Sequence, residues 1–499
     1  MPPRRTMNHR VRRSVLAALP IVLVMVSLVV AFVAEPALAG RKRTYRLKKG
    51  VTLTNISRRG PVKIHLITIT NPNARSATVD VGSAGRSFPA WREPSDIARA
   101  NRAIAAVNGD FARDGRPIHP SAEDGDLRST GLATGVAFAV SSNERRGFAN
   151  RPNPRVEADT SNPQAGSFRI DRWNAGGAGS GRIVGYTPVG GSVERPDKDN
   201  CTARLLPAEG TAGRRQWGRD GTVKRTYVVE RQPEPCPNEA ASVGAEPGTV
   251  VIAAKRDGGQ ADTIKALSIG DKVTISWGVG WGGVLDVIGG APQLLADRDG
   301  NGNPTVTAPK DCASYFCSRN PRTGVGVNHA CVVGHDGCKV FLMTVDGRRP
   351  GYSIGMDLAQ LARQFERVGA DWAINLDGGG GAAMWVANRG RYCQKATAGG
   401  CLVSRPSDPN GERPAVSSVM VLPDSDRGEP LDPRRVAEAS PLLPATTAAE
   451  SLANTNLALT DPGSTGGLLD AIFGGGLGRA PARSSVLWQD VQVYRASRR

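Results

Sequence analysis

Two aspartates follow short apolar runs, in positions where carboxylates could do chemistry. Asp346 follows the run 339–345, and Asp377 follows 372–376 and precedes four consecutive glycines. Carboxylates at strand ends can activate water, and backbone N–H groups in a glycine-rich turn are free to face a ligand. An isolated Asp-Gly pair is more often an ordinary turn, and a glycine run is usually a loop. Their placement after two predicted strands is what favours a site here.

The two aspartates belong to a predicted strand–helix–strand unit. The runs 339–345 and 372–376 have the short, continuous apolar pattern of buried strands. Between them, apolar residues recur at helical spacing from Leu358 to Val368, with Asp357 as the N-cap and Gly369 as the stop. The unit would hold both carboxylates at strand ends.

Further strands are predicted at 61–70, 103–107, 249–254, 272–277 and 416–422. Together these elements predict an α+β fold, with a mixed β-sheet core, few helices and long disulfide-stapled loops. We expect one domain over 40–423. Within it, 141–245 is rich in Arg, Pro, Gly and Asn and is expected to be a loop-rich insertion. Residues 424–499 have the low-complexity composition of a disordered tail.

Residues 1–39 have the pattern of a signal peptide. Five arginines precede an apolar run, and Ala-Leu-Ala at 37–39 supplies a signal-peptidase site, so the mature chain would begin near Gly40. An uncleaved membrane anchor is the alternative, because the apolar run is long. We therefore expect a secreted or cell-envelope protein, with any membrane contact confined to this segment.

The charge balance favours anionic partners. The 499 residues include 64 Lys+Arg and 46 Asp+Glu, which gives 64 − 46 = +18. Residues 1–39 hold five Arg and one Glu, so the mature chain keeps 18 − 4 = +14. Acidic polymers, phosphate-bearing substrates and nucleic acid all fit such an excess. No aromatic-interleaved nucleic-acid module is present, so we expect no nucleic-acid partner.

The eight cysteines suit an oxidising compartment. Proximity along the chain suggests four bridges, although eight cysteines allow 105 connectivities. A zinc site is the poorer alternative, because the chain has no C-x-x-C pair. The suggested pairs are Cys201–Cys236, Cys312–Cys317, Cys331–Cys338 and Cys393–Cys401.

Six short motifs occur in an order that resembles the phosphodiester glycosidase family. The segment 412–414 and the strand 416–422 resemble the family's closing segment. The resemblance covers about 60–423, with 141–245 matching poorly. Each motif alone is weak, and their common order is the specific signal. The motifs are Asn-Gly-Asp-Phe at 108–111, Ile-Gly-Gly-Ala-Pro-Gln-Leu at 288–294, Arg-Thr-Gly-Val-Gly-Val at 322–327, Val-Asp-Gly-Arg at 345–348, Ser-Ile-Gly-Met-Asp-Leu-Ala at 353–359 and Asn-Leu-Asp-Gly-Gly-Gly at 375–380.

The resemblance implies hydrolysis between the anomeric carbon of a sugar and a phosphodiester. Phosphate leaves readily, so the site must chiefly stabilise positive charge on the sugar and negative charge on the phosphate. We expect the carboxylates to act on the sugar and arginine forks to hold phosphate. The expected catalytic residues are Asp377, Asp346, Arg322 and Asn108. The expected substrate-binding residues are Asp110, Thr323, Arg348, Gly378, Gly379, Gly380 and Arg413.

Three features qualify this expectation. The family commonly has Ser after the third glycine of the run, where this chain has Gly381. Gly-Tyr-Ser-Ile-Gly at 351–355 has the spacing of a nucleophile elbow, but the preceding strand ends too early, so Ser353 is expected to be a loop residue. A calcium ion near Asp297, Asp299 and Asn301 is an alternative to a polar turn, although the twelfth loop position is Ala308 rather than Glu. We expect no other cofactor and no metal in the catalytic site.

The sequence thus favours an exported hydrolase that acts on sugar-1-phosphodiester or related linkages in envelope glycans. A non-catalytic protein that binds an anionic cell-wall polymer through the same pocket is the alternative. Its partner in either case would be a glycan or a sugar-phosphate polymer.

Overall fold

The computed structural model describes residues 40–423, apart from 73–76, 134, 142–145, 151–153, 209–215, 218–222, 232–235, 237–241, 244–247, 280–283, 298–301, 310–314 and 334–335. The predicted signal peptide and tail lie outside the described residues.

Strands dominate the described chain, and the helices are few and short. Nearly all strand pairs are antiparallel, and β14 with β15 is the parallel pair among the described strands. The expected α+β class therefore holds only as a strand-dominated fold, and "mixed" overstates the parallel pairing. The helices are α2 (Pro94–Ala100), α3 (Ala261–Ala266), α4 (His329–Val333) and α5 (Leu358–Arg367), with 3₁₀ turns η1 (Pro188–Gly190) and η2 (Gly379–Gly381).

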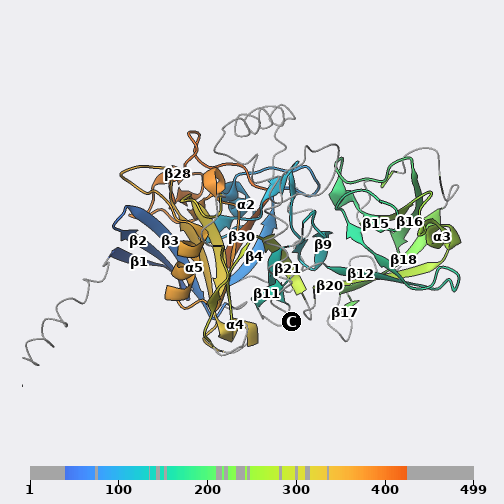
Figure 1. The fold of residues 1–499 in the computed structure, drawn as a ribbon, viewed down its shortest axis with the longest axis horizontal. Helices are drawn as coiled ribbons and strands as arrows, with labels where there is room; N and C mark the ends of the chain where they lie inside the picture. The colour runs from blue at the N-terminus through green and yellow to red at the C-terminus, as the bar shows by residue number, and fades with distance from the viewer. Residues whose placement is uncertain are drawn as a thin grey trace, which may run out of the picture.

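An eight-stranded sheet forms one side of the main core (Figure 1). Its strands, in spatial order, are β1 (Arg41–Lys48), β2 (Val51–Arg58), β3 (Val62–Thr70), β25 (Lys339–Val345), β24 (Arg322–Val327), β26 (Trp372–Asn375), β22 (Gln293–Ala296) and β23 (Thr305–Val306). The predicted strands 61–70, 339–345 and 372–376 are confirmed as β3, β25 and β26.

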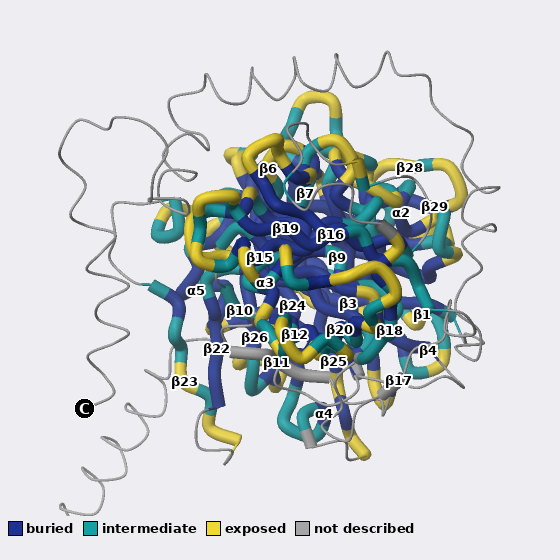
Figure 2. Tube along the Cα trace, turned by 90° about the vertical axis from the view of Figure 1, so that its right-hand side faces the viewer, coloured by how far each residue is buried: buried dark blue, intermediate teal, exposed yellow. Residues whose placement is uncertain are grey.

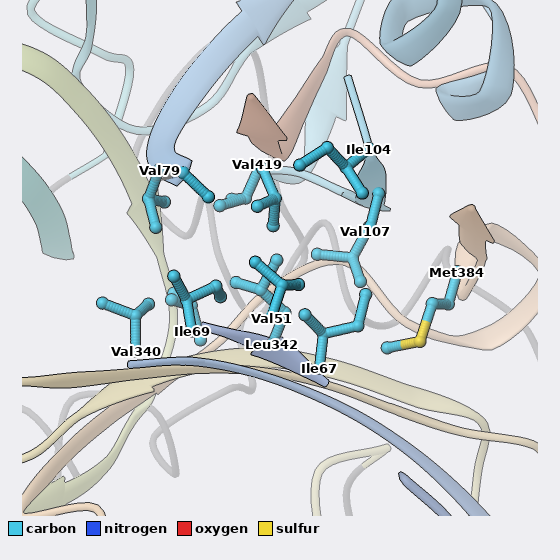
Figure 3. Packing of buried hydrophobic residues seen from close by; sticks show 14 of the residues in the cluster. Val51, Ile67, Ile69, Val79, Ile104, Val107, Val340, Leu342, Met384 and Val419 are labelled. Carbon is cyan, nitrogen blue, oxygen red and sulfur yellow. The ribbon is translucent and has the colours of Figure 1, made fainter. Parts of the chain in front are cut away.

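A six-stranded sheet packs on the eight-stranded sheet and completes the core. Its order is β28 (Lys395–Thr397), β29 (Gly400–Leu402), β27 (Met384–Val386), β5 (Ala105–Asn108), β30 (Ser417–Pro423) and β4 (Ala77–Ser83). Figure 3 shows the packing between the sheets, with Val79, Val107 and Val419 from one and Ile67 and Leu342 from the other. Burial of these aliphatic faces fixes how the strand ends of the two sheets meet.

Helix α5 covers the opposite face of the eight-stranded sheet. Leu358, Leu361 and Phe365 are fully buried and pack with residues of β3 and β25. The predicted cap is confirmed, since Asp357 Oδ1 accepts a hydrogen bond from the Gln360 amide at 2.7 Å. Gly369 lies just past the end with a φ of 88°, which a residue with a Cβ adopts at a cost.

A nine-stranded sheet lies apart from the first two, at the right of Figure 1. It has its own buried core, in which β16 and β19 run through the interior (Figure 2). Much of this sheet comes from 141–245, so that segment is far richer in strand than its Gly, Pro and Arg content predicted. The strands, in order, are β13 (Phe168–Ile170), β12 (Arg155–Thr160), β20 (Lys272–Gly278), β18 (Val223–Arg231), β16 (Asn200–Pro207), β19 (Val250–Lys255), β15 (Ile183–Tyr186) and β14 (Arg172–Trp173), with β17 (Gln216–Trp217) beside β18.

A five-stranded sheet connects these parts. Its order is β11 (Arg146–Asn150), β10 (Val136–Ser141), β21 (Val284–Gly290), β8 (Ser121–Glu123) and β9 (Asp126–Ser129), and a small hairpin pairs β6 (Ala112–Arg113) with β7 (Arg116–Pro117).

Three of the suggested disulfides are confirmed: Cys201–Cys236, Cys331–Cys338 and Cys393–Cys401. Cys312, expected to pair with Cys317, lies outside the described residues. Within the described ranges, no helix combines the length and hydropathy needed to cross a membrane.

Candidate active site

The topology of the eight-stranded sheet brings three predicted site residues together at the ends of neighbouring strands. β25 and β26 each pair antiparallel with β24, which lies between them, so β25 and β26 run in the same direction. The carboxyl ends of β25 and β26 therefore lie beside the amino end of β24. Asp346 and Asp377 follow the two carboxyl ends, and Arg322 opens β24.

The first part of the glycine run makes room for an arginine and a tyrosine. A Cβ on Gly379 would lie 2.9 Å from the Tyr315 hydroxyl and 3.3 Å from Arg348 Nη2, and the φ of Gly379 is +59°. A Cβ on Gly378 would lie 2.8 Å from the Pro321 carbonyl oxygen. Glycine is required here because both groups approach the backbone directly.

The second part of the run makes room for charged groups. A Cβ on Gly380 would collide with Asp408 Oδ1 and Arg413 Nη2, and one on Gly381 would lie 2.6 Å from Asp377 Oδ2. Arg413 is itself paired with Asp408, through Nε and Nη2 at 2.8 Å each. The run thus lies at the meeting point of two carboxylates and two guanidinium groups.

The amides of the glycine run mostly have partners within the chain. The Gly378 amide donates to Asp377 Oδ1 at 2.9 Å, and the Gly379 amide donates to the Pro321 carbonyl at 2.9 Å. The Gly381 amide donates to the Gly378 carbonyl at 3.1 Å. The run therefore contributes close approach of neighbouring side chains more than a set of free N–H donors.

Asp377 is a half-buried carboxylate in this cluster. Burial raises the pKa of Asp377 to about 6, against the opposing effect of the Arg413 guanidinium, and the charges of Asp110 and Asp408 add to the rise. A carboxyl group with this pKa exchanges protons near neutral pH, which suits general acid–base chemistry.

Asp346 has internal partners for both carboxylate oxygens. Oδ2 lies 3.0 Å from His65 Nε2 and accepts a hydrogen bond from the Tyr352 hydroxyl at 3.0 Å. Oδ1 accepts one from the Arg405 amide at 2.9 Å. The Ser353 hydroxyl donates to the Asp346 carbonyl at 2.5 Å, so Ser353 is a buried loop residue, as expected. Asp346 thus joins four segments and holds the turn that carries Arg348.

Arg322 is fully buried and clamps a loop. Its Nε donates to the Met356 carbonyl at 2.9 Å, and its Nη2 donates to the carbonyls of Tyr315 and Ser318 at 2.8 Å each. Its guanidinium also lies 4.7 Å from the centre of the Tyr315 ring. Nη1 has no hydrogen-bond partner among the described residues. The Arg322 guanidinium, which was expected to bind phosphate, is therefore hydrogen-bonded mainly to backbone carbonyls.

Asn108, at the end of β5, links the two sheets. Its Nδ2 donates to the Asp377 carbonyl at 2.7 Å, and its Oδ1 accepts from Thr323 Oγ1 at 2.7 Å and from the Ala383 amide at 3.0 Å. Asn108 and Thr323 are both buried. Their hydrogen bonds hold the Asp377 backbone in place, and the expected contact of either side chain with substrate stays a prediction.

Asp110 is buried in a pair with His119. Oδ1 lies 2.6 Å from His119 Nδ1 and accepts from the Phe111 amide at 2.8 Å, while Oδ2 accepts from the His119 amide at 2.8 Å. Asp110 was expected to bind substrate, but its oxygens are used inside the fold.

Two residues of the cluster, Tyr315 and Asp408, escaped the sequence analysis. Burial raises the pKa of the Tyr315 hydroxyl, so this group is a neutral donor at neutral pH. Tyr315 lies between Cys312 and Cys317, and a tyrosine inside so short a cysteine-bounded loop is the signal that could have marked it. Asp408 lies in a Pro- and Gly-containing loop with no such mark.

The proposed calcium loop is only partly described. Asp297 is buried, and its Oδ2 accepts a hydrogen bond from the Gly302 amide at 3.1 Å and lies 3.7 Å from His329 Nδ1. Asp299 and Asn301 lie outside the described residues, so the calcium site stays a prediction. No group of three or more potential metal ligands occurs within the ranges that the structure describes.

Three solved structures resemble this fold. A hypothetical protein from Synechocystis superposes with a TM-score of 0.52 at 18% identity, covering 77% of this chain, and the chain spans 64% of that protein's length. A Burkholderia pseudomallei K96243 protein gives 0.48 at 20% identity, with 73% and 74% of the two chains covered. The catalytic domain of zebrafish N-acetylglucosamine-1-phosphodiester alpha-N-acetylglucosaminidase, auto-inhibited by its pro-peptide, gives 0.35 at 15% identity, with 78% and 85% covered.

None of the curated proteins compared with the chain matches it. The family model of the phosphodiester glycosidases matches residues 224–422, a segment that contains Asp346, Asp377, the glycine run and Arg413. The resemblance found in the motifs is therefore confirmed, since residues 224–422 match the phosphodiester glycosidase family model.

Proposed function

We propose that the chain is an exported hydrolase that cleaves sugar-1-phosphodiester linkages in envelope glycans. The observation that carries the proposal is Asp377, a carboxyl group with a pKa near 6 that faces a glycine run beside Arg348 and Arg413. The family match of the surrounding segment supports glycosidase chemistry.

Asp377 is assigned the role of general base. It takes a proton from water as the water oxygen bonds to the anomeric carbon and the bond from that carbon to the phosphate oxygen breaks. The electron pair of the broken bond leaves with the phosphate. Because phosphate is a good leaving group, the step needs little acid assistance.

Arg348 and Arg413 are assigned to the phosphate. Both guanidinium groups lie against the glycine run, and charge-assisted hydrogen bonds from arginine are strong and directional. The neutral hydroxyl of Tyr315 is a further donor at the same place. Asp408 keeps Arg413 in position through two contacts of 2.8 Å.

Asp346, Arg322, Asn108 and Asp110 are assigned positioning roles, because their polar atoms already bond within the fold. Asn108 holds the backbone of Asp377, and Asp346 closes the turn that carries Arg348 through its contacts with Tyr352 and Ser353. This differs from the direct catalytic roles that the resemblance implied for three of them.

Export is proposed from the signal-like segment 1–39 and the disulfides. Three disulfides among the described residues are typical of proteins that fold outside the reducing cytosol.

The test is release of reducing sugar from a panel of sugar-1-phosphodiesters with methyl-phosphate and nucleotide aglycones. The proposal is supported if the wild type releases sugar and the variant Asp377→Ala releases none but still binds the substrate. Binding without release from any member by the wild type would favour the alternative, a non-catalytic polymer-binding protein.

A further inference from the structure

On one face of the eight-stranded sheet, the side chains change from apolar to polar along the strands β1, β2 and β3. Toward the middle it carries the apolar core, with Leu53 on β2 and Ile67 on β3 fully buried. Toward the other end the same alternation places polar side chains on that face. The register pairs Arg43 with Asn55 and Asn55 with His65, and it pairs Arg41 with Ser57 and Ser57 with Lys63. Alternate residues of a strand share a face, so these two polar rows continue the core face.

A cavity of about 290 Å³ opens over these rows. Four cationic side chains line it, namely Arg41, Arg43, Lys63 and Arg391, and its lining contains no aspartate or glutamate. Arg43 and Arg391 are exposed at its mouth. An anion entering this cavity would therefore meet uncompensated positive charge.

Tyrosines form much of the remaining wall. Tyr45 and Tyr392 pack edge to face with ring centres 5.1 Å apart, and Tyr352 lies under Lys63 with the ammonium 5.6 Å from its ring centre. Aromatic faces beside hydrogen-bonding groups such as Gln394 suit the apolar faces and hydroxyls of a sugar ring. The lining thus combines groups for phosphate with groups for sugar.

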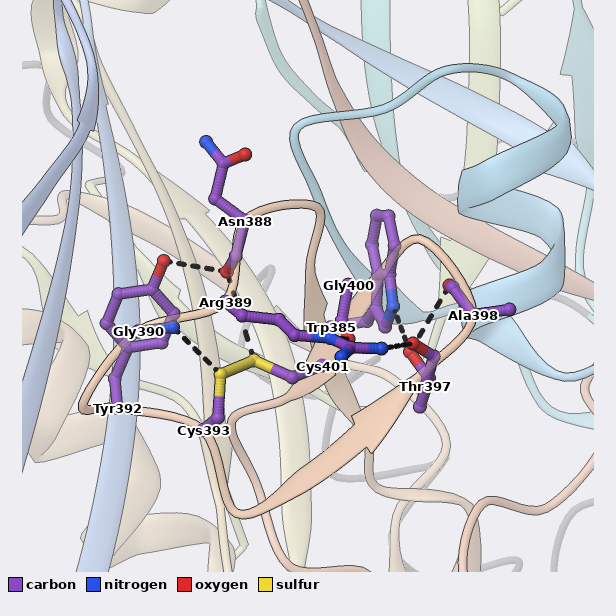
Figure 4. Close-up of a disulfide and its surroundings, with 10 residues drawn as sticks. All are labelled: Trp385, Asn388, Arg389, Gly390, Tyr392, Cys393, Thr397, Ala398, Gly400 and Cys401. Atoms are coloured by element: carbon purple, nitrogen blue, oxygen red, sulfur yellow. Dashed lines mark hydrogen bonds between the residues drawn. A yellow bond between two sulfur atoms is a disulfide. The ribbon is translucent and has the colours of Figure 1, made fainter.

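The wall that carries Tyr392 and Gln394 is rigid. Figure 4 shows that the disulfide Cys393–Cys401 closes this loop and that the Tyr392 hydroxyl donates to the Asn388 carbonyl, at 2.7 Å. The Gln394 amide donates to the Leu402 carbonyl at 2.8 Å. A preformed wall lowers the entropy cost of binding.

The cavity adjoins the candidate active site. His65 and Tyr352 line the cavity and both contact Asp346 Oδ2, at 3.0 Å each. Arg348, which faces Gly379, is two residues from Asp346, a span of at most about 7 Å along the chain. Asp346 thus lies behind the cavity wall and connects it, through His65 and Tyr352, to the turn that carries Arg348.

We propose that this basic cavity binds a second phosphate-bearing sugar of a polymeric substrate, next to the linkage that is cleaved. The inference rests on the proposed function for the identity of the polymer, while the cavity's preference for a sugar phosphate rests on its own lining. The substrate class is a glycan with repeating phosphodiesters, and the cavity supplies affinity for the chain beyond the reacting linkage.

The test compares a trimer of N-acetylglucosamine 1-phosphate repeats with a methyl-phosphate diester of the single sugar. The variant Arg43→Ala/Arg391→Ala removes two exposed cations from the cavity. The control Lys42→Ala/Arg46→Ala removes two exposed cations from the same strand β1 on its opposite face. Kinetics follow both substrates, and calorimetry follows trimer binding to each protein carrying Asp377→Asn.

We expect the cavity variant to weaken trimer binding about 10-fold or more and to leave kcat/KM for the single diester within about twofold. The control should change trimer binding by less than about threefold, since general charge attraction is shared among many residues. Equal loss in both variants, or no loss in the cavity variant, overturns the inference while leaving hydrolysis of the single diester intact. If no substrate is hydrolysed but the cavity variant alone loses trimer binding, the proposed hydrolase fails and the cavity stands.

Discussion

At the scale of single residues, the ionisation of Asp377 controls the proposed chemistry. The carboxyl group loses hydration on burial, and the Arg413 guanidinium offsets only part of that loss, which leaves the pKa at about 6. A carboxyl group acts as a general base in its ionised form, and the ionised fraction increases as the pH rises through the pKa.

We therefore expect kcat/KM to rise with pH and to level off above an apparent pKa of about 6. Asp377→Asn should lower kcat/KM by roughly 100-fold or more, and its residual kcat/KM should not rise with pH near 6. Arg413→Ala should raise the apparent pKa of the kcat/KM profile, because the cation that favours the ionised form of Asp377 is gone. A rate that falls through pH 6 would mean that the protonated form acts.

The same pKa shift has a consequence for stability. Because the folded protein holds the proton more tightly than the unfolded chain, the stabilisation from this group is present at low pH and is lost as the pH rises through about 6. Asp377→Asn should accordingly gain stability relative to the wild type above pH 6, and denaturant titrations at pH 5 and pH 8 measure the difference.

Gly381 occupies the position where the family commonly has Ser. A Cβ there would lie 2.6 Å from Asp377 Oδ2, so any side chain must displace the carboxylate. We expect Gly381→Ala to lower kcat/KM about 10-fold or more with little change in Tm. Gly259→Ala is the matched control, because nothing lies within 4 Å of a Cβ at that position. Full activity of Gly381→Ala would show that the carboxylate can rotate without cost.

At the scale of elements, short loops pinned to strands hold the groups that the sheets cannot reach. The disulfide loop 388–402 carries Tyr392 and Gln394, and the loop 405–413 carries Arg413 and also caps Asp346 through the Arg405 amide. The first loop is held by contacts within itself, such as that of the Tyr392 hydroxyl with the Asn388 carbonyl. The second is held by contacts with distant segments, such as that of the Arg405 amide with Asp346.

Removing the disulfide Cys393–Cys401 tests the first loop. With a sequence separation of eight between the cysteines, the chain-entropy model gives about 2–3 kcal/mol of stability. We expect Cys393→Ala/Cys401→Ala to lose that much in denaturant unfolding and to weaken trimer binding more than hydrolysis of the single diester. Equal losses for both substrates would place the loop's influence at the catalytic cluster instead.

At the scale of the whole molecule, two separate cores support different tasks. One lies between the eight- and six-stranded sheets behind the candidate active site, and the other belongs to the nine-stranded sheet. Each is large enough to unfold as its own cooperative unit.

We expect two calorimetric transitions. Ile252→Ala in the second core and Leu342→Ala in the first should each cost about 2–5 kcal/mol, because both side chains are fully buried. Each variant should lower one transition only, and Ile252→Ala should leave kcat/KM unchanged below that transition. A single transition lowered by both variants would show that the cores unfold together.

Local sequence signals were sufficient to predict several strands, helix α5 and three disulfides. Apolar periodicity, the Asp357 cap and the Gly369 stop predicted β25, α5 and β26, because these signals act within a few residues. Proximity predicted the three described disulfides, and the motif order led to the family that the model match confirmed. Composition failed for 141–245, because strand pairing across the chain overrides local propensity.

The polar atoms left available for a ligand depend on contacts between segments far apart in the sequence. Asp346, Arg322, Asn108 and Asp110 have residue types that suit catalysis, yet their partners come from segments far away in sequence, such as His65 for Asp346 and Thr323 for Asn108. A hydrogen bond satisfies a buried polar group only where two segments meet, and no local pattern encodes that meeting. For the same physical reason, the basic cavity exists only where strands from 41–65 face the loops that carry Tyr352 and Arg391.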